Sequence, residues 1–318
     1  METVFMPMLL FTLGLFILIK GGDTFVDAAV WISDVTGIPK LIIGATVISI
    51  ATTLPELFVS VLATADGSLG IATGNAIGSV TANIGVGMSI GLIASPAAVN
   101  LKDFAPKACI MLLAAVALLR LGVDGRISIT DSFMLMAVLA AYIYSNVKSG
   151  QRAHTDNSAG RIPITFPEAA QNTAKFVLGA CGIVLGASML VTNGQILAYA
   201  LGVSEDIIGL TLIAVGTSLP ELITAATAIA KNESALTVGN IIGANIIDTA
   251  LILPVCSMVS GGGLAISPRT VYIDLPAAIL LMLLVLMPTI KNKAFKKWQG
   301  VVILSFYVVY VLFIVMFT

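Results

Sequence analysis

The chain has 318 residues, of which 58% are hydrophobic and 10% are charged, and its formal net charge is −1. A soluble domain carries roughly 25% charged residues, so this composition excludes a soluble globular protein and predicts an integral membrane protein. There is no basic stripe for nucleic acid, and the three cysteines lie far apart in apolar runs, which excludes a disulfide framework or a zinc site.

Ten apolar runs reach the length of about 20 residues that a membrane-spanning helix needs. Backbone polar groups in lipid must be hydrogen-bonded within the segment, so each run is predicted to be a helix and the fold all-α. The first run has no basic region before it and no cleavage site after it, so we expect a span and not a signal peptide. In chain order the runs are residues 2–20, 38–64, 69–95, 104–122, 127–147, 171–192, 205–230, 234–259, 270–289 and 298–317.

The longest polar interruption, residues 148–170, divides the chain into two sets of five predicted spans. We therefore expect a first five-helix unit over residues 1–147, a linker over 148–170 and a second unit over 171–318. The single histidine, His154, lies in this linker, where a solvated side chain is expected.

The positions of the basic residues predict the orientation, because cytoplasmic loops carry an excess of Lys and Arg. With ten spans, thirteen of the sixteen basic residues fall on one side and three on the other. The side with thirteen, which includes the linker 148–170, is predicted to be cytoplasmic, and both termini outside. The three on the other side are Arg120, Arg126 and Arg269.

The sequence contains an internal repeat with an offset of 165 residues. GATVISIATTLPELF (44–58) aligns with GLTLIAVGTSLPELI (209–223), and GNAIGSVTAN (74–83) aligns with GNIIGANIID (239–248). Since each half has an odd number of spans, the second half enters the membrane from the opposite face, and the repeats are predicted to be inverted. Inverted repeats of secondary transporters place the substrate site at the midplane, on broken helices. Glycines of the first helix of each half keep the same register: Gly14 with Gly179, and Gly21 with Gly186.

Each repeat carries a glutamate in the middle of a predicted span, Glu56 in the first and Glu221 in the second. An ionised carboxylate at the bilayer centre is unfavourable by several kcal/mol or more and is usually paired. No Lys or Arg occurs between residues 41 and 101. The partner is therefore expected to be a cation from outside the chain, or a proton.

The residues around Glu56 favour a metal ion. Thr52 and Thr53 precede it by about one helical turn, on neighbouring faces. Pro55 has no N–H and displaces the helix carbonyl four residues before it, which leaves backbone oxygens available for coordination. Pro220 occupies the same place in the second copy.

The candidate ligands of both copies are all hard oxygens, which suit calcium and also sodium but not zinc or copper. Two glutamates neutralise one divalent ion, so a third acid would need a proton or a monovalent cation. This favours exchange between a divalent and a monovalent ion. The candidates are Glu56, Glu221, Asp248, Asn83, Ser79, Ser218 and the threonine side chains.

The paired G-[TS]-[TS]-L-P-E and G-N-x-[IL]-G-[SA] motifs resemble the α-repeats of the cation/calcium antiporter superfamily, and most closely its prokaryotic sodium/calcium exchanger branch. The resemblance covers nearly the whole chain, and its specific part is residues 44–91 and 209–254. It implies a ten-helix antiporter of the prokaryotic plasma membrane that carries calcium and sodium. It implies neither an enzymatic activity nor a cofactor, and no phosphate-binding loop for ATP occurs.

The resemblance also implies a diamond-shaped cluster of cation sites and a gate in which helices one and six slide across the bundle. Its calcium ligands would be Glu56, Glu221 and the backbone carbonyls of Thr52 and Thr217. Its flanking sodium sites would use the hydroxyls of Thr53 and Ser218, carbonyls near Ser49 and Ala214, and Ser79, with Asn83 and Asp248 in the middle. Its gate would pack on Gly14, Gly21, Gly179 and Gly186.

The predicted function is exchange of sodium for calcium, and the alternative is a calcium/proton antiporter that uses the same carboxylates. Two departures from the family pattern bear on this choice: Ala51 replaces a glycine, and Ala244 removes a hydroxyl from a sodium site. The proton-coupled branch carries a G-N-A-x-E signature and a histidine there, which this chain lacks. A cation channel and an intramembrane hydrolase are other classes, and the duplicated, symmetrical ligand sets argue against both.

Overall fold

The structure is a computed structural model that describes residues 2–96, 98–156, 165–201 and 214–317. Nearly all of them are helical, as the prediction of an all-α membrane protein requires. The elements, with η for a 3-10 or π-helical segment, are α1 (Glu2–Thr36), α2 (Lys40–Ile43), η1 (Gly44–Ile48), α3 (Ser49–Thr52), α4 (Leu54–Ala65), α5 (Leu69–Ala82), η2 (Asn83–Met88), α6 (Ser89–Ala94), α7 (Leu101–Leu121), η3 (Gly122–Asp124), β1 (Arg126–Ile127), α8 (Ile129–Asp156), α9 (Phe166–Ala200), α11 (Ala214–Thr217), α12 (Leu219–Ala230), α13 (Ser234–Ile247), η6 (Asp248–Ile252), α14 (Leu253–Val259), β2 (Leu264–Ala265), η7 (Thr270–Asp274), α15 (Leu275–Asn292) and α16 (Lys297–Phe317).

Within the described residues, seven helices are long and apolar enough to cross a membrane on their own. An eighth span is broken: residues 40–52 and 54–65 form a helix pair bent by 41°. The predicted span over 205–230 is described from residue 214 onward, where α12 supplies a shorter apolar helix of 12 residues. The predicted span over 127–147 begins too early, because Ile127 lies in β1, and its remainder falls in the 28-residue helix α8, which begins at Ile129.

The first helix is longer than the sequence reading predicts. The apolar run over 2–20 predicts a span that ends there, with Asp23, Asp27 and Asp34 in a solvated interfacial segment after it. The predicted end is wrong, because α1 continues without interruption to Thr36, but the acids do reach solvent, since the side chains of Asp23 and Asp27 are 49% and 57% exposed. Phe25, Val26, Ala28 and Ala29 in this extension are fully buried, so packing holds a segment whose acidic residues suggested solvent. Similarly, α8 and α9 extend into the predicted linker 148–170 from either side, as far as Asp156 and from Phe166.

The element boundaries follow the sequence repeat. Helices α4 and α12 begin at residues 54 and 219, and helices α5 and α13 begin at 69 and 234, so both pairs differ by 165 (54 + 165 = 219; 69 + 165 = 234). The π-helical segments η2 and η6, which follow α5 and α13, begin at Asn83 and Asp248 with the same offset. The local sequence thus specifies the same succession of break, helix and π turn twice.

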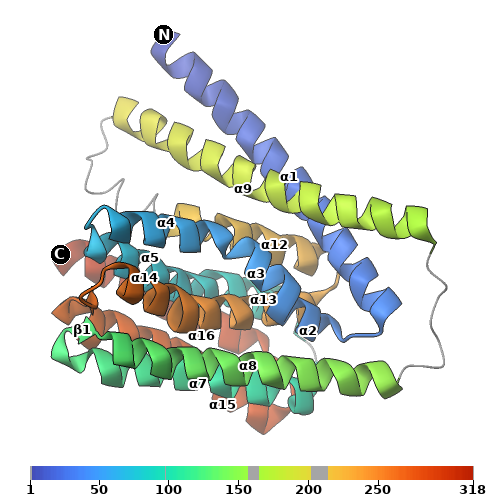
Figure 1. Cartoon of the computed structure of the whole chain (residues 1–318). Helices are drawn as coiled ribbons and strands as arrows, with labels where there is room; N and C mark the ends of the chain where they lie inside the picture. Colours follow the sequence, from blue (N-terminus) through green and yellow to red (C-terminus); the bar gives the residue numbers. More distant parts are fainter. Residues whose placement is uncertain (1, 97, 157–164, 202–213, 318) are drawn as a thin grey trace.

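Helices α1 and α9 cross each other along one side of the molecule, and α7, α8 and α15 lie along the opposite side (Figure 1). Helices α4, α5, α12 and α13 lie between these two sides. Helix α4 packs on α5 and α12 packs on α13, and α12 also contacts both α1 and α9 of the crossed pair. In the spans that contain α5 and α13, 78% and 83% of residues are buried, against 17% in α1. The two repeated motifs therefore occupy the centre of the protein.

Glycines allow α1 and α9 to approach closely. A Cβ added at Gly186 would lie 2.6 Å from the backbone nitrogen of Leu18, and one added at Gly14 would lie 2.7 Å from the Cβ of Met189. Gly21 and Gly179 face the partner helix at similarly short range. All four predicted glycines thus lie in this one interface, where any larger residue would separate the helices.

Ion pairs tie one end of α1 to α12. The ammonium group of Lys231, directly after α12, lies 2.6 Å from a carboxylate oxygen of Asp23 and 2.6 Å from one of Asp27. Trp31 on α1 donates a hydrogen bond of 3.1 Å to Glu168 on α9. These contacts hold the crossed pair together and fix it against the central helices.

Candidate cation site

The two glutamate-bearing helices are broken in the same way. Thr53 separates α3 from α4 with φ −87° and ψ 0°, and Ser218 separates α11 from α12 with φ −85° and ψ 0°. A proline follows each break in the first turn of the new helix, where its missing N–H disrupts least. Glu56 and Glu221 lie in those first turns, where the helix dipole favours a negative charge.

Three acids are buried inside the protein at this level. Glu56 and Asp248 are 0% exposed and Glu221 is 1% exposed. Both carboxylate oxygens of Glu56, both of Asp248 and Oε2 of Glu221 have no hydrogen-bond partner among the described residues. The charge of Glu56 is repelled by those of Glu221 and Asp248. Buried charges without partners are strongly unfavourable, so these oxygens fit the coordination of a cation or the uptake of a proton.

Side chains of the two repeats meet across this region. Thr53 donates a hydrogen bond of 3.1 Å from its hydroxyl to Oε1 of Glu221. The hydroxyls of Ser218 and Ser79 are 2.9 Å apart. The structure therefore brings together residues that the sequence separates by 168 and 139 positions, as the prediction of one shared site requires.

Asn83 and Asp248 begin equivalent π-helical segments in the interior. Asn83 is 1% exposed, and its Nδ2 donates a hydrogen bond of 3.2 Å to Oδ1 of Asn245. Its own Oδ1 is buried and has no hydrogen-bond partner among the described residues. π-Helical turns inside α-helices are frequent at functional sites. Oxygens of both residues thus remain available inside the protein.

Two other predicted ligands, Ser49 and Ala214, and the departure at Ala244 differ in what they offer. The backbone carbonyl of Ser49 already accepts from the hydroxyl and the N–H of Thr53, at 2.7 and 3.0 Å. Ala214 is the first residue of α11. Ala244, the counterpart of Ser79, is fully buried and brings no hydroxyl.

No group of three or more His, Cys, Asp or Glu side chains is spaced to hold one metal ion within the described ranges. Calcium takes about six to eight oxygen ligands, more than two carboxylates supply. Hydroxyl, amide and carbonyl oxygens would complete its coordination, which is common for calcium and rare for zinc.

Two buried asparagines, Asn75 and Asn240, were missed as candidates by the sequence reading. The hydroxyl of Thr217 donates a hydrogen bond of 2.8 Å to Oδ1 of Asn75. The hydroxyl of Thr52 donates one of 3.2 Å to Oδ1 of Asn240. The signal was present, because both asparagines belong to the G-N motif and share the offset of 165 (75 + 165 = 240).

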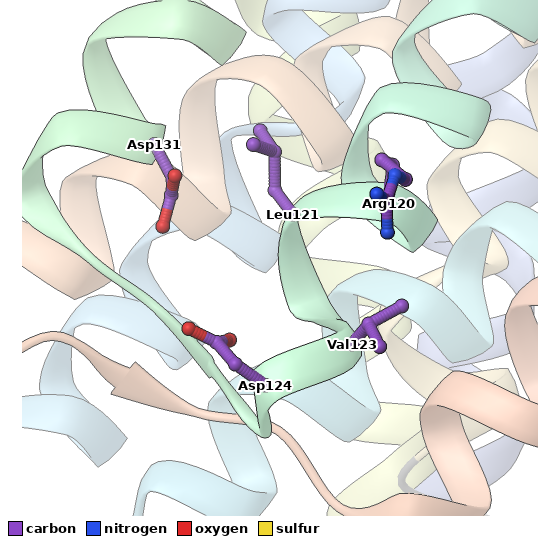
Figure 2. A pocket seen from close by; sticks show the side chains of 5 residues that line it. All are labelled: Arg120, Leu121, Val123, Asp124 and Asp131. Atoms are coloured by element: carbon purple, nitrogen blue, oxygen red, sulfur yellow. The ribbon is translucent and has the colours of Figure 1, made fainter.

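A surface pocket of about 440 Å³ lies elsewhere, at the turn between α7 and α8 (Figure 2). It is lined by Arg120, Leu121, Val123, Asp124 and Asp131 and shares no residue with the buried acids. Asp124 accepts a hydrogen bond from the backbone of Arg126, and Asp131 accepts one from the backbone of Ser128. These carboxylates stabilise local turns, so the pocket offers no second carboxylate site.

A helical membrane protein with buried, unpartnered carboxylates between two matching halves has the features of a membrane ion transporter. The family model described as sodium/calcium exchanger protein matches residues 6–148 and 172–316. The chain therefore belongs to the sodium/calcium exchanger family, which confirms the resemblance of the paired motifs.

Individual relatives agree with this assignment. An uncharacterized membrane protein of Methanocaldococcus jannaschii is 32% identical over 306 residues, covering 94% of this chain and 95% of that protein. The sodium/calcium exchanger MaX1 of Methanosarcina acetivorans is 27% identical over 340 residues, covering 95% and 96%. The solved structure of the sodium-calcium exchanger NCX_Mj soaked with Na⁺ and Sr²⁺ matches with a TM-score of 0.85 and 31% identity, covering 96% of this chain and 98% of that one.

Proposed function

We propose that this protein is a secondary active antiporter that exchanges sodium for calcium at a midplane site through alternating access. The observation that carries the proposal is the set of buried carboxylate oxygens, contributed by both repeats, that have no partner in the part of the chain that the structure describes. A bound cation would supply a positive charge to these carboxylates. The family membership and the similarity to named sodium/calcium exchangers support calcium and sodium as the ions.

We assign calcium to the pair Glu56 and Glu221, together with the backbone carbonyls of Thr52 and Thr217. Each of these threonines lies immediately before its helix break, directly after the carbonyl that the proline leaves without an N–H partner. Two carboxylates balance one divalent charge. Flanking sodium sites would use Thr53, Ser218, Ser79 and the region of Ser49 and Ala214, and Asn83 and Asp248 would lie between them.

The architecture that we propose has ten spans in two inverted units, residues 1–147 and 171–318, joined by 148–170. The broken pair and the repeated element boundaries support the pairing of the halves. The uneven distribution of Lys and Arg supports a cytoplasmic linker and external termini in a plasma membrane.

Alternating access would come from movement of α1 and α9 as a unit across the remaining helices. The glycine contacts around Gly14, Gly21, Gly179 and Gly186 support a tightly packed pair. The crossed pair also lies on one side of the molecule, so it can shift without repacking the opposite side (Figure 1).

Proton coupling is the second candidate, and two features favour it. Asp248 is a third buried acid whose oxygens have no partner among the residues described, and a carboxylate in that position can titrate. Ala244 also lacks the hydroxyl that Ser79 supplies in the first repeat. In this alternative the same carboxylates bind calcium and release protons.

The test is uptake of radiolabelled calcium into proteoliposomes loaded with sodium, with potassium-loaded and pH-gradient vesicles as controls. Uptake driven by an outward sodium gradient alone, and lost in Glu56→Gln, supports sodium/calcium exchange. Uptake that needs a pH gradient supports the proton alternative, and uptake without any counter-ion gradient indicates a channel. Asp274→Asn is the matched control, because Asp274 is also a buried acid but pairs with Tyr310.

A further inference from the structure

Asn75 and Asn240 occupy equivalent positions on α5 and α13 and are 5% and 0% exposed. Each accepts a hydrogen bond from a threonine of the opposite repeat, Thr217 for Asn75 and Thr52 for Asn240. Both threonines are the last residues of their short helices, one position before the break. The two asparagines therefore hold the backbone in place at the two helix breaks.

The contact also sets the direction of the threonine hydroxyl. A hydroxyl has one proton to donate and two lone pairs to offer. When the proton is directed to an asparagine oxygen, the lone pairs of the threonine oxygen are turned away from that asparagine. The amide thus holds the threonine side chain in one orientation, and with it the residue whose backbone carbonyl is assigned to calcium.

The two asparagines are anchored unequally. Nδ2 of Asn75 donates to the backbone oxygen of Glu56 at 3.2 Å and to the hydroxyl of Ser60 at 2.9 Å. These two acceptors also fix the orientation of the amide, so its oxygen faces Thr217. Asn75 therefore connects one glutamate-bearing helix directly to the opposite repeat.

Asn240 lacks these partners. Its Nδ2 is buried and has no hydrogen-bond partner among the described residues. The counterpart of Ser60 is Ala225 (60 + 165 = 225), which is 1% exposed and has no hydroxyl. The contact with Thr52 is also longer, 3.2 Å against 2.8 Å. The sequence difference at one position accounts for the weaker anchor.

We propose that Asn75 and Asn240 are positioning residues of the cation site, each holding the site threonine of the opposite repeat, and that Ala225 leaves the Asn240 anchor the weaker of the two. The inference rests on the proposed function, because it assigns these threonines to a bound calcium ion. Loss of Asn75 then weakens calcium binding more than loss of Asn240. A hydroxyl added at position 225 strengthens the second anchor.

The experiment measures equilibrium binding of radiolabelled calcium to the purified protein in detergent, together with KM and kcat for uptake. A double-mutant cycle combines Asn75→Ala with Thr217→Val, which removes the hydroxyl but keeps the volume. If Asn75 acts through Thr217, each single variant weakens calcium binding by about tenfold, and the double variant is no weaker than the worse single variant. A purely structural asparagine gives effects that multiply, and this result would overturn the inference.

Two further variants test whether Asn75 and Asn240 are anchored unequally, and both variants keep the two asparagines. Ser60→Ala should weaken calcium binding by about threefold, and Ala225→Ser should strengthen it by a similar factor, with KM changed and kcat retained. If neither variant moves KM, the unequal anchoring is wrong, and these variants decide the matter if Asn75→Ala does not fold. If the wild-type protein binds no calcium, the proposed function and this inference are both overturned. If the wild type binds calcium normally but the effects of Asn75→Ala and Thr217→Val on binding multiply in the double variant, the inference alone is overturned.

Discussion

The hydroxyl of Thr53 in the first repeat lies 3.1 Å from the carboxylate of Glu221 in the second, and it shares its one proton between this carboxylate and the carbonyl of Ser49 at 2.7 Å. Glu221 is thereby oriented by the opposite half of the protein, while its other oxygen has no partner among the described residues. The carboxylate is held at one oxygen and available at the other. A ligand held in this way is preorganised for a cation, because its rotamer is fixed before the ion arrives.

Thr53→Val should therefore weaken calcium binding. The substitution keeps the volume and removes the hydrogen bond to a charged group, which contributes roughly 1.5–3 kcal/mol, so the KM for calcium is expected to rise by about tenfold or more. Thr53→Ser retains the hydroxyl and should remain close to the wild type. Equal KM values for all three proteins in the uptake assay would contradict this orientation of Glu221.

Asp248→Asn should separate calcium from its counter-ion. The substitution keeps the shape of the side chain and removes a buried charge that has no partner among the described residues. Calcium binding in detergent is expected to persist, because Glu56 and Glu221 remain, whereas the dependence of uptake on sodium should become less steep. A variant that loses calcium binding completely would show that Asp248 is instead a calcium ligand.

Gly186→Val should block movement without removing any proposed ligand. A side chain at this position would clash with the backbone of α1 near Leu18, and the crossed pair would have to separate. We expect calcium uptake to fall to background while calcium binding in detergent remains measurable. Gly150→Ala is the control, since a Cβ there meets no atom within 4 Å. Normal uptake by Gly186→Val would mean that close packing of this pair is not required.

Lys231→Met should loosen the end of α1. Desolvation lowers the pKa of Lys231, but the pairs with Asp23 and Asp27 outweigh it and raise this pKa above its ordinary value. A raised pKa means that the stabilisation is complete below the ordinary pKa and is lost as the pH rises through the raised one. The wild type should therefore keep these pairs at neutral pH and lose them in strong alkali, where the ammonium group gives up its proton.

The measurement is thermal unfolding in detergent as a function of pH. The melting temperature of Lys231→Met should be slightly lower than that of the wild type at neutral pH, because partly exposed ion pairs contribute about 1 kcal/mol or less. The two proteins should converge at high pH. Lys102→Met, at an exposed residue, is the control, and a constant gap at all pH values would show that packing rather than charge is responsible.

Much of this arrangement follows from the sequence, for identifiable reasons. Pro55 and Pro220 predict the two helix breaks because proline lacks an N–H, and the offset of 165 predicts that the motifs form equivalent structures. The all-α membrane class follows from hydropathy. The four glycines of the first helices indicate close packing, and the structure places them in one interface.

Other features could not be read from the sequence. The acidic residues after position 20 suggested that α1 ends there, but contacts with α9 and α12 decide its length, and Lys231 neutralises two of those acids. Asn75 and Asn240 were treated as part of a motif, because their threonine partners lie 142 and 188 residues away. The carbonyl of Ser49 looked available, although the hydroxyl of Thr53 occupies it.

The ion pairs of Lys231 have no equivalent at the corresponding positions of the other half. The counterpart of Lys231 is Asp66, and the counterparts of Asp23 and Asp27 are Ser188 and Thr192. If the halves of an inverted repeat were chemically identical, the inward-open and outward-open states would have equal free energies by symmetry. The cationic side chain of the second half and the two carboxylates of the first have no matching contact at the corresponding positions, so they contribute a difference in free energy between the two states.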